Sequence, residues 1–206
     1  MTEPKRQDRG EIKRREVLQA TIRLLARDGP RGVTHRAVAA EAGTSLRSTT
    51  YYFSSREELL TEALRHYAET AMDRFTAIGA PVAEHAMSPE EGAADLLAAT
   101  VLSDVVEDRA GLVAEYELVL EIGRNEALEA AYRAWQARLE SMLVAYAELL
   151  GSLDPAMDAR IVLATLRGLE IEALATPSRK PDRADLRSVF KVLLEALAAR
   201  REKGRR

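Results

Sequence analysis

The sequence predicts an all-α protein of about nine helices. Apolar residues recur at three- and four-residue spacing along most of the 206 residues, whereas the alternation of apolar and polar residues that marks a half-buried strand is absent. Serine, threonine, aspartate, glycine and proline interrupt this pattern where helices should begin or end. Hydrophobic residues make up 47% of the chain, which is ample for a core in one domain or two small ones.

The first helix is expected to follow a short charged segment. Residues 1–9 are rich in charge and are predicted to form a disordered arm. The helix should run from about residue 10 to Asp28, because the glycine- and proline-rich residues 29–32 stop it. Its buried stripe should comprise Val17, Leu18, Thr21, Ile22, Leu24 and Leu25.

A helix-turn-helix is predicted between Thr34 and Tyr52. Thr34 opens the first helix, and Gly43 can take the positive φ that a tight turn needs. Ser45 can cap the second helix, which spans Leu46 to Tyr52. Its exposed side chains provide hydrogen-bond donors, one fixed charge and two flat rings, which suit a DNA groove and its phosphates better than a protein core. They are Arg47, Ser48, Thr50, Tyr51 and Tyr52.

Capping signals place the remaining helices. Ser55 and Glu58 form a capping box at the start of a long helix that should end at about Ile78, before a loop over residues 79–87. Ser88 caps the next helix, with proline in its first position. The last five helices are predicted over residues 89–108, 110–123, 126–150, 155–175 and 183–200, followed by a basic tail over 201–206.

Charge is distributed unevenly along the chain. The net charge is −3, but residues 1–56 hold 12 basic and 6 acidic side chains, a balance of +6, and residues 57–206 have a balance of −9. A basic N-terminal module joined to an acidic remainder is what a DNA-binding head on a separate effector body requires. On charge alone, a solvated charged face is the alternative.

Several function classes lose support. The chain has no cysteine, which excludes disulfides, thiolate metal sites and cysteine catalysis. Glu62 and His66 have the spacing of two metal ligands on a helix, but a solvated polar pair is the commoner arrangement. No HExxH motif, glycine-rich phosphate loop or Gly-x-Ser-x-Gly turn occurs. We therefore expect no metal or other cofactor and no catalytic residues, with an all-helical enzyme, adaptor or RNA binder as remote alternatives.

No stretch has the length and apolarity of a signal peptide or a membrane-spanning helix. A cytoplasmic protein without a membrane partner is the expectation.

The segment Thr34 to Arg56 resembles the DNA-binding domain of the TetR family of transcriptional regulators. The matching residues are Gly29, Thr34, Val38, Ala39, Ala42, Gly43, Ser45, Phe53, Arg56, Glu58 and Leu59. The sequence departs from the family pattern at Arg47, Thr49 and Thr50, where the family usually has a small, an apolar and a tyrosine residue, and Arg56 replaces a phosphate-gripping lysine. Residues 109–135 resemble the ligand-binding domain of the family.

The resemblance implies a DNA-binding domain over residues 10–55 and a helical ligand-binding and dimerisation domain over 56–200. It implies a homodimeric regulator of double-stranded DNA, most often a repressor that a small hydrophobic effector releases from a palindromic operator. An activator, or a regulator that needs no ligand, is the alternative. Arg47 is expected to read a base, and Thr50, Tyr51, Tyr52 and Arg56 to hold phosphates. The full DNA surface is predicted as Thr34, His35, Arg36, Ser45, Leu46, Arg47, Ser48, Thr49, Thr50, Tyr51, Tyr52 and Arg56.

Two further surfaces are predicted in the C-terminal part. Large, partly polar side chains in helical rhythm indicate a ligand pocket, although such a stripe is also typical of plain core. The candidates are Phe75, Thr100, Tyr116, Leu120, Tyr132, Trp135, Leu139, Met142 and Thr165. The last two helices are apolar on more than one side, which favours a dimer contact over burial within one subunit. Its candidates are Ala164, Gly168, Ile171, Ala175, Phe190 and Leu194.

Overall fold

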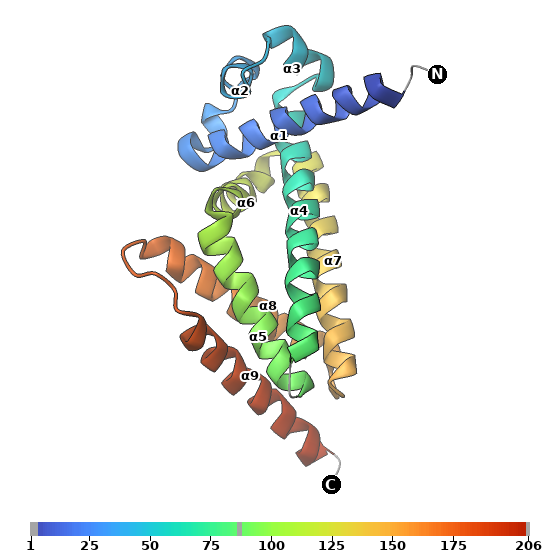
Figure 1. The fold of residues 1–206 in the computed structure, drawn as a ribbon, viewed down its shortest axis with the longest axis vertical. Helices are drawn as coiled ribbons and strands as arrows, with labels where there is room; N and C mark the ends of the chain where they lie inside the picture. The colour runs from blue at the N-terminus through green and yellow to red at the C-terminus, as the bar shows by residue number, and fades with distance from the viewer. Residues whose placement is uncertain (1–3, 86–87, 205–206) are drawn as a thin grey trace. The chain divides into compact units, whose positions relative to one another are not determined.

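The computed structural model describes residues 4–85 and 88–204, and all regular structure within them is helical (Figure 1). The helices are α1 (Pro4–Gly32), α2 (His35–Glu41), α3 (Leu46–Tyr52), α4 (Arg56–His85), α5 (Pro89–Leu102), α6 (Arg109–Glu121), α7 (Glu126–Leu149), α8 (Pro155–Ala175) and α9 (Arg183–Gly204). A π-helical turn (Ser103–Glu107) follows α5 and a 3-10 turn (Ile122–Arg124) follows α6. The predicted all-α fold is confirmed. None of these helices is long and apolar enough to cross a membrane.

The predicted caps explain where several helices start. The hydroxyl oxygens of Thr34, Ser45 and Ser88 accept backbone N–H bonds at the first turns of α2, α3 and α5, and the Asp154 carboxylate does so for α8. Each cap satisfies a backbone donor that has no partner inside its helix. The bounds of α3 and α8 are as predicted.

Two helices extend beyond their predicted ends. Helix α1 begins at Pro4, within the predicted arm, and its helical backbone breaks at Gly29, where φ is 67°. Helix α4 continues through Gly79 and Pro81 to His85, so the predicted loop is wrong up to that residue, and residues 86–87 lie outside the described part. A Cβ at Gly79 would lie 3.8 Å from a methyl group of Leu96, so this side of α4 faces α5, and the helix continues despite the roughly 1 kcal/mol cost of a helical glycine.

Smaller differences affect the other helices. Helix α5 gives way to the π-helical turn after Leu102, six residues before its predicted end, and α9 reaches Gly204. Part of the predicted basic tail is therefore helical, while residues 205–206, like residues 1–3 of the predicted arm, lie outside the described residues.

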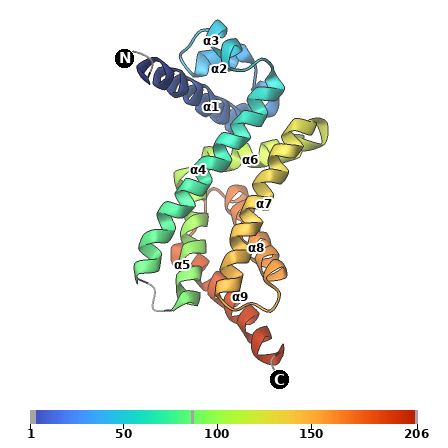
Figure 2. The same cartoon turned by 90° about the vertical axis from the view of Figure 1, so that its right-hand side faces the viewer.

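The chain forms two compact units. We call Met1–Thr70 with Ala110–Trp135 the head, and Ala71–Arg109 with Gln136–Arg206 the body. The long helices α4 and α7 contribute residues to both (Figure 2). The units divide the chain differently from the predicted domains, because the start of α4, α6 from its second residue on and the start of α7 join α1–α3 in one unit.

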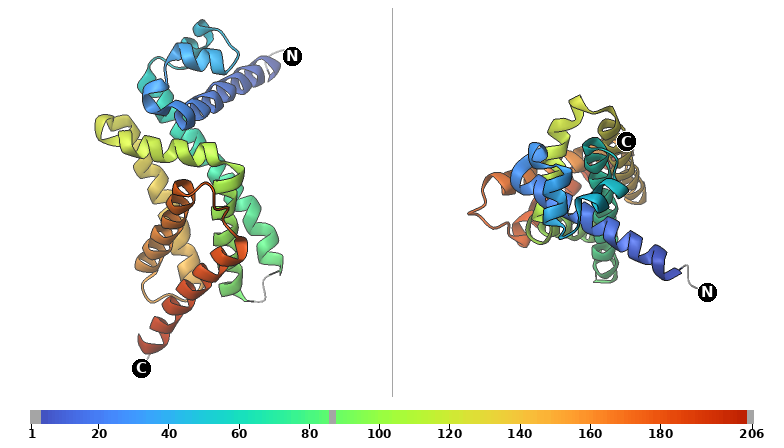
Figure 3. Two further views of the ribbon diagram at one scale, coloured as in Figure 1. Left: turned by 90° about the vertical axis from the view of Figure 1, so that its left-hand side faces the viewer. Right: turned by 90° about the horizontal axis from the view of Figure 1, so that it is seen from above.

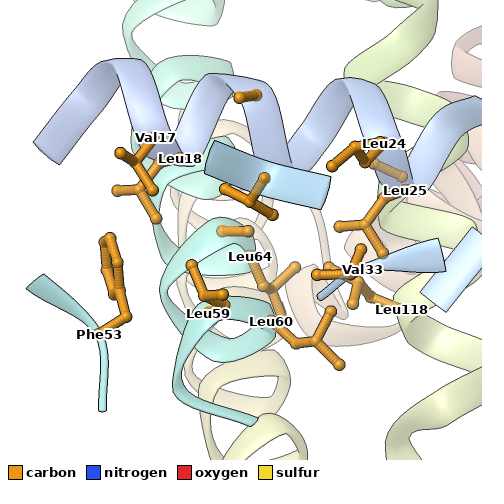
Figure 4. Packing of buried hydrophobic residues seen from close by; sticks show 14 of the residues in the cluster. Val17, Leu18, Leu24, Leu25, Val33, Phe53, Leu59, Leu60, Leu64 and Leu118 are labelled. Carbon is orange, nitrogen blue, oxygen red and sulfur yellow. The ribbon is translucent and has the colours of Figure 1, made fainter. Parts of the chain in front are cut away.

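The core of the head lies between α1 and α4. Val17, Leu18 and Leu25 of α1 point toward Leu59 and Leu64 of α4 (Figure 4). All five side chains are at most 1% exposed, as are Phe53 and Val33 from the connections that flank α2 and α3. Burial of such side chains is the main stabilising term for this unit. The predicted stripe of α1 is confirmed, with Ile22 only partly buried.

The body is built mainly on α5 and α9, which lie side by side, with α8 packed against both (Figures 1 and 3). Arg187 of α9 donates to Asp95 of α5 at 2.9 Å. Arg74 of α4 bridges Asp104, at 3.0 Å, and Asp108, at 2.6 Å, at the π-helical turn. Ion pairs therefore connect α9 to α5, and α4 to the turn that follows α5.

Candidate nucleic-acid interface and effector cavity

A rigid turn positions α3 after α2. Gly43 takes a φ of 61°, a left-handed conformation that disfavours side chains. The Thr44 N–H donates to the Ala39 carbonyl at 2.9 Å and the Gly43 N–H to the Ala40 carbonyl at 3.2 Å, which closes the end of α2. The Ser45 cap follows immediately, with a 3.1 Å bond from the Ser48 N–H. Backbone geometry thus fixes the direction in which α3 leaves the turn.

Helix α3 presents polar and aromatic side chains to solvent. Arg47 and Thr50 are exposed, Tyr51 is 80% exposed and Leu46 is 47% exposed. Tyr52 is half-buried and its ring meets that of Tyr51 edge to face, with centroids 5.1 Å apart. A short, capped helix with such a surface has the donors and flat rings that a major groove and its phosphates accept.

The start of α2 adds to this polar surface. Thr34 and Arg36 are exposed, and His35 is half-buried. The Thr34 hydroxyl is already used as the cap, accepting from the Ala37 N–H at 3.1 Å. Arg36 is therefore the charged side chain that α2 offers to solvent at its first turn.

Thr49 is an exception among the α3 residues predicted to face DNA. It is fully buried, and its hydroxyl donates to the Leu46 carbonyl at 2.8 Å. Every third or fourth residue of a helix shares one face, and the face that carries Thr49 is turned toward the protein. The prediction that Thr49 contacts DNA is wrong.

Arg56 has intramolecular partners in the structure. Its Nε donates to the Val33 carbonyl at 3.1 Å and its Nη2 to the Pro30 carbonyl at 2.5 Å. The side chain thereby ties the first residue of α4 to the connection between α1 and α2. The predicted phosphate contact of Arg56 stays a prediction, and it would compete with these two bonds.

Ion pairs neutralise part of the basic charge of the head. Glu41 accepts from Arg23 at 2.8 Å and from Arg27 at 3.0 Å. These hydrogen bonds, from Arg23 first, lower the pKa of Glu41 below its ordinary value. Arg36 and Arg47 are exposed cations at the start of α2 and in α3. Arg36 and Arg47 thus place exposed positive charge on both helices of the helix-turn-helix.

Two of the cavities in the body are neighbours. The inner cavity, of about 40 Å³, is lined by Phe75, Ala93, Leu96, Leu97, Leu143, Tyr146, Ala147, Leu150, Asp158, Ala159, Val162, Leu194 and Leu197. The outer cavity, of about 370 Å³, is lined by Gly79, Val82, Ser88, Pro89, Gly92, Ala93, Leu96, Tyr146, Leu149 and Leu150. Four lining residues are shared, so the two spaces adjoin each other. Their mainly apolar walls suit a hydrophobic ligand.

The structure does not bring the predicted ligand residues together. Phe75 lines the inner cavity, whereas Thr100, Leu139, Met142 and Thr165 of the body line neither cavity. Both threonine hydroxyls donate to the backbone of their own helix. The helical rhythm alone gave no signal for other lining residues, such as Leu150 and Asp158.

The other ligand candidates belong to the head. Leu120 is 80% exposed, so its assignment to a pocket wall is wrong. Tyr132 packs against the core of the head, and Tyr116 is half-buried. The Trp135 indole donates to the Glu115 carboxylate at 3.1 Å and meets the Tyr67 ring edge to face. Trp135 is thus a core residue with a satisfied polar atom, the alternative that its position in a helical stripe had left open.

The predicted dimer face divides into two groups. Ala164, Gly168, Ile171 and Ala175 of α8 are all exposed, and Ile171 is 52% exposed. Phe190 and Leu194 of α9 are buried within the body, so their assignment to an intersubunit contact is wrong. Helix periodicity shows that α9 has two apolar sides but not which side packs inward. The exposed side carries Val189 and Val192, at 42% and 66% exposure.

Two family models match successive parts of the chain. Residues 17–63 match the model of bacterial regulatory proteins of the tetR family, and residues 88–196 match that of the tetracyclin repressor-like C-terminal domain. The chain belongs to the TetR family. It is therefore a DNA-binding transcriptional regulator of this family, and α2 and α3 are its helix-turn-helix.

Individual TetR-family proteins resemble most of the chain. The nicotine-responsive transcriptional repressor HdnoR of Paenarthrobacter nicotinovorans is 25% identical over 173 residues, which are 81% of this chain and 86% of that protein. A TetR-family structure from Streptomyces coelicolor A3 is 31% identical, with a TM-score of 0.70, over 88% of this chain and 97% of that chain. The multidrug binding protein EbrR in complex with ethidium is 30% identical, with a TM-score of 0.62, over 88% and 98%.

Proposed function

We propose that this TetR-family regulator is a repressor that binds a near-palindromic operator as a homodimer. The observation that carries the proposal is the exposed set of Arg47, Thr50 and Tyr51 on a capped, rigidly positioned α3. Two such helices related by a twofold axis would enter successive major grooves about 34–36 Å apart, or a multiple of that distance. Repression is supported by HdnoR, which is named as a repressor.

Within this interface Arg47 is proposed to read a base. An arginine in the major groove donates two hydrogen bonds to guanine, and such a pair contributes about 1–3 kcal/mol of discrimination. Thr50, Tyr51 and Tyr52 would bind phosphates from the same helix, and Arg36 from the start of α2. Leu46 and Ser48 complete the proposed α3 surface, because both keep exposed or half-exposed side chains.

The dimer is proposed to form through α8 and α9. The exposed stripe of Ala164, Gly168 and Ile171 allows close approach of a second helix, because two of these residues have little or no side chain. Val189 and Val192 extend the apolar surface on α9. These exposed residues would replace Phe190 and Leu194 in the contact.

The effector is proposed to bind in the two cavities of the body and to weaken DNA binding. A small, largely hydrophobic effector is supported by the apolar linings of both cavities. It is also supported by the names of two similar proteins, because HdnoR is called nicotine-responsive and EbrR is described in complex with ethidium. Helix α4 lines both cavities and begins at Arg56 beside the helix-turn-helix. By linkage, an effector that lowers the affinity of the protein for DNA must itself bind the DNA-bound protein more weakly than the free protein. The two affinities fall by the same factor.

A binding titration tests the DNA-reading assignment. Genomic fragments retained by the protein would be narrowed to an operator, and each base pair would then be varied. Arg47→Ala should lose about 1–3 kcal/mol of discrimination at one position of each half-site. Arg133→Ala, an exposed α7 arginine, is the matched control and should bind like wild type. Unchanged affinity and preference for Arg47→Ala would refute the assignment.

A further inference from the structure

A single carboxylate lines the two cavities of the body. Among the described residues that line them, Asp158 is the only charged one. We propose that this site takes an organic cation with an apolar body, whose positive charge pairs with Asp158. The inference rests on the effector site proposed above and specifies the chemical class of its ligand.

The burial of Asp158 makes its charge available to a ligand rather than to water. The residue is 5% exposed and lies in the first turns of α8, at the wall of the inner cavity. A carboxylate removed from water needs hydrogen bonds and an opposite charge. Ser152 Oγ donates to its Oδ2 at 2.6 Å, and Arg200 Nη1 lies 3.3 Å from its Oδ1.

The present counter-charge of Asp158 is held weakly. The Arg200 side chain is 54% exposed, and a single contact of this kind to a solvated guanidinium contributes little. A cation that enters the cavity would sit on the side of the carboxylate that now faces apolar side chains. There it would be shielded from water, where attraction between opposite charges is stronger.

Aromatic rings complete a site for an organic cation. Phe75 and Tyr146 meet edge to face, with centroids 6.2 Å apart, and both line the inner cavity. The faces of aromatic rings attract cations, and their area also binds an apolar ligand body. No arginine or lysine lines either cavity among the described residues, so an anionic ligand would meet the Asp158 charge without compensation.

Room for such a ligand requires the two cavities to join. The inner cavity, at about 40 Å³, holds little more than one water molecule. The outer cavity, at about 370 Å³, lies within the range of about 300–1,000 Å³ that small-molecule sites occupy. Tyr146 lines both and is 38% exposed, and the proposal requires its side chain to rotate so that the outer space reaches Asp158.

Ethidium is a suitable probe because it carries a permanent positive charge and its fluorescence rises when it leaves water. The full-length protein is titrated without DNA, since ethidium also intercalates into DNA. Asp158→Asn should weaken binding by about tenfold or more, and Arg200→Ala should strengthen it a few-fold because a competing cation is removed. Glu148→Gln, which removes an exposed α7 carboxylate outside both linings, should leave affinity unchanged.

A matched pair of competitors separates charge from shape. Benzyltrimethylammonium and neopentylbenzene have the same shape, but only the first is charged. The cation should displace ethidium from the wild type at lower concentration than the neutral compound, and Asp158→Asn should abolish this difference. Val162→Phe, which fills the inner cavity, should reduce ethidium binding and so locate the probe there.

Wild-type affinity of Asp158→Asn for ethidium, or weaker binding by Arg200→Ala, would overturn the proposal. Circular dichroism shows whether each variant folds. If Asp158→Asn does not fold, the proposal is decided by whether Arg200→Ala binds ethidium more tightly or more weakly than wild type. Failure of the proposed function has a different signature. In that case the charge-dependent binding persists, but a non-intercalating cation that binds the site leaves the operator complex intact.

Discussion

The Arg56 guanidinium donates to the Val33 carbonyl at 3.1 Å, although the two residues are 23 positions apart. Val33 is fully buried, and the same guanidinium also reaches the Pro30 carbonyl. A side chain at the start of α4 thus completes the hydrogen bonding of the connection that positions α2. In this TetR-family regulator, the joint between the long helix and the helix-turn-helix is held by an arginine.

The main effect of Arg56→Ala should be to destabilise the head rather than to weaken phosphate binding. The substitution leaves the Val33 carbonyl without its donor, which costs about 1–3 kcal/mol for a buried group, whereas the Pro30 carbonyl keeps the Val33 N–H at 3.2 Å. Arg36→Ala is the matched variant, since Arg36 is exposed at the start of α2. It should keep wild-type stability and reduce the slope of log affinity against log salt by about 0.9 per lost phosphate contact. Urea unfolding and salt titrations measure both. A reduced salt slope with unchanged stability for Arg56→Ala would show that its main role is to hold phosphate.

Two adjacent threonines of α3 should respond differently to the same change. Thr49→Val removes a buried hydroxyl whose nearest acceptor, at 2.8 Å, is the Leu46 carbonyl of its own helix, with the His35 carbonyl at 3.4 Å, so operator affinity should remain within about threefold of wild type. The Thr50 hydroxyl donates to the Leu46 carbonyl at 3.1 Å but is exposed, so it can turn to a phosphate, and Thr50→Val should weaken binding by about 0.5–1.5 kcal/mol through that lost hydrogen bond. Fluorescence anisotropy with labelled operator measures both affinities. Equal losses for the two variants would contradict the inward orientation of Thr49.

Gly168→Glu should separate the subunits without disturbing the protomer. A Cβ at Gly168 meets no atom within 4 Å, so the new side chain fits on the exposed surface of α8. Two buried glutamates at a twofold interface are costly, because charge is removed from water without a partner. Sedimentation velocity should show monomers with much weaker operator binding. Ala130→Glu, at an exposed α7 position, is the control and should stay dimeric. A stable Gly168→Glu dimer would remove this interface.

The pair formed by Ser54 and Glu58 should make stability depend on acid pH. The Ser54 hydroxyl at 2.7 Å, and then the Ser54 N–H at 2.6 Å, donate to the Glu58 carboxylate and lower its pKa from the ordinary 4.5. A carboxyl with a lowered folded-state pKa stabilises the fold above the unfolded-state value, and this contribution is lost as pH falls through the folded-state pKa.

Ser54→Ala removes the larger cause of that shift. The variant should be less stable than wild type near neutral pH, and the difference should shrink as pH falls below about 4.5. Urea midpoints measured from neutral to acid pH test this. Glu57→Gln, which removes an exposed neighbouring carboxylate, is the control and should not reproduce the effect. A stability difference that stays constant with pH would exclude this linkage.

Local chemistry in the sequence determined the helical fold and much of the helix-turn-helix. The caps at Thr34 and Ser45 act on backbone N–H groups three residues away, so their partners can be read directly from the chain. The same holds for Gly43, where a turn of this length requires a left-handed residue. Helix α3, with its exposed Arg47, was therefore predictable from residues 43–52 alone.

Tertiary structure decided which side of each helix is buried and which partner each polar group takes. Periodicity shows that α9 has more than one apolar side, but only its packing on α5 makes Phe190 internal and leaves Val192 exposed. Glycine and proline disfavour a helix locally, yet α4 continues through Gly79 and Pro81 to His85. Arg56 and Asp158 likewise find partners 23 and 42 residues away. Burial and long-range hydrogen bonds depend on residues brought together by folding, so their outcome cannot be read from neighbours in the chain.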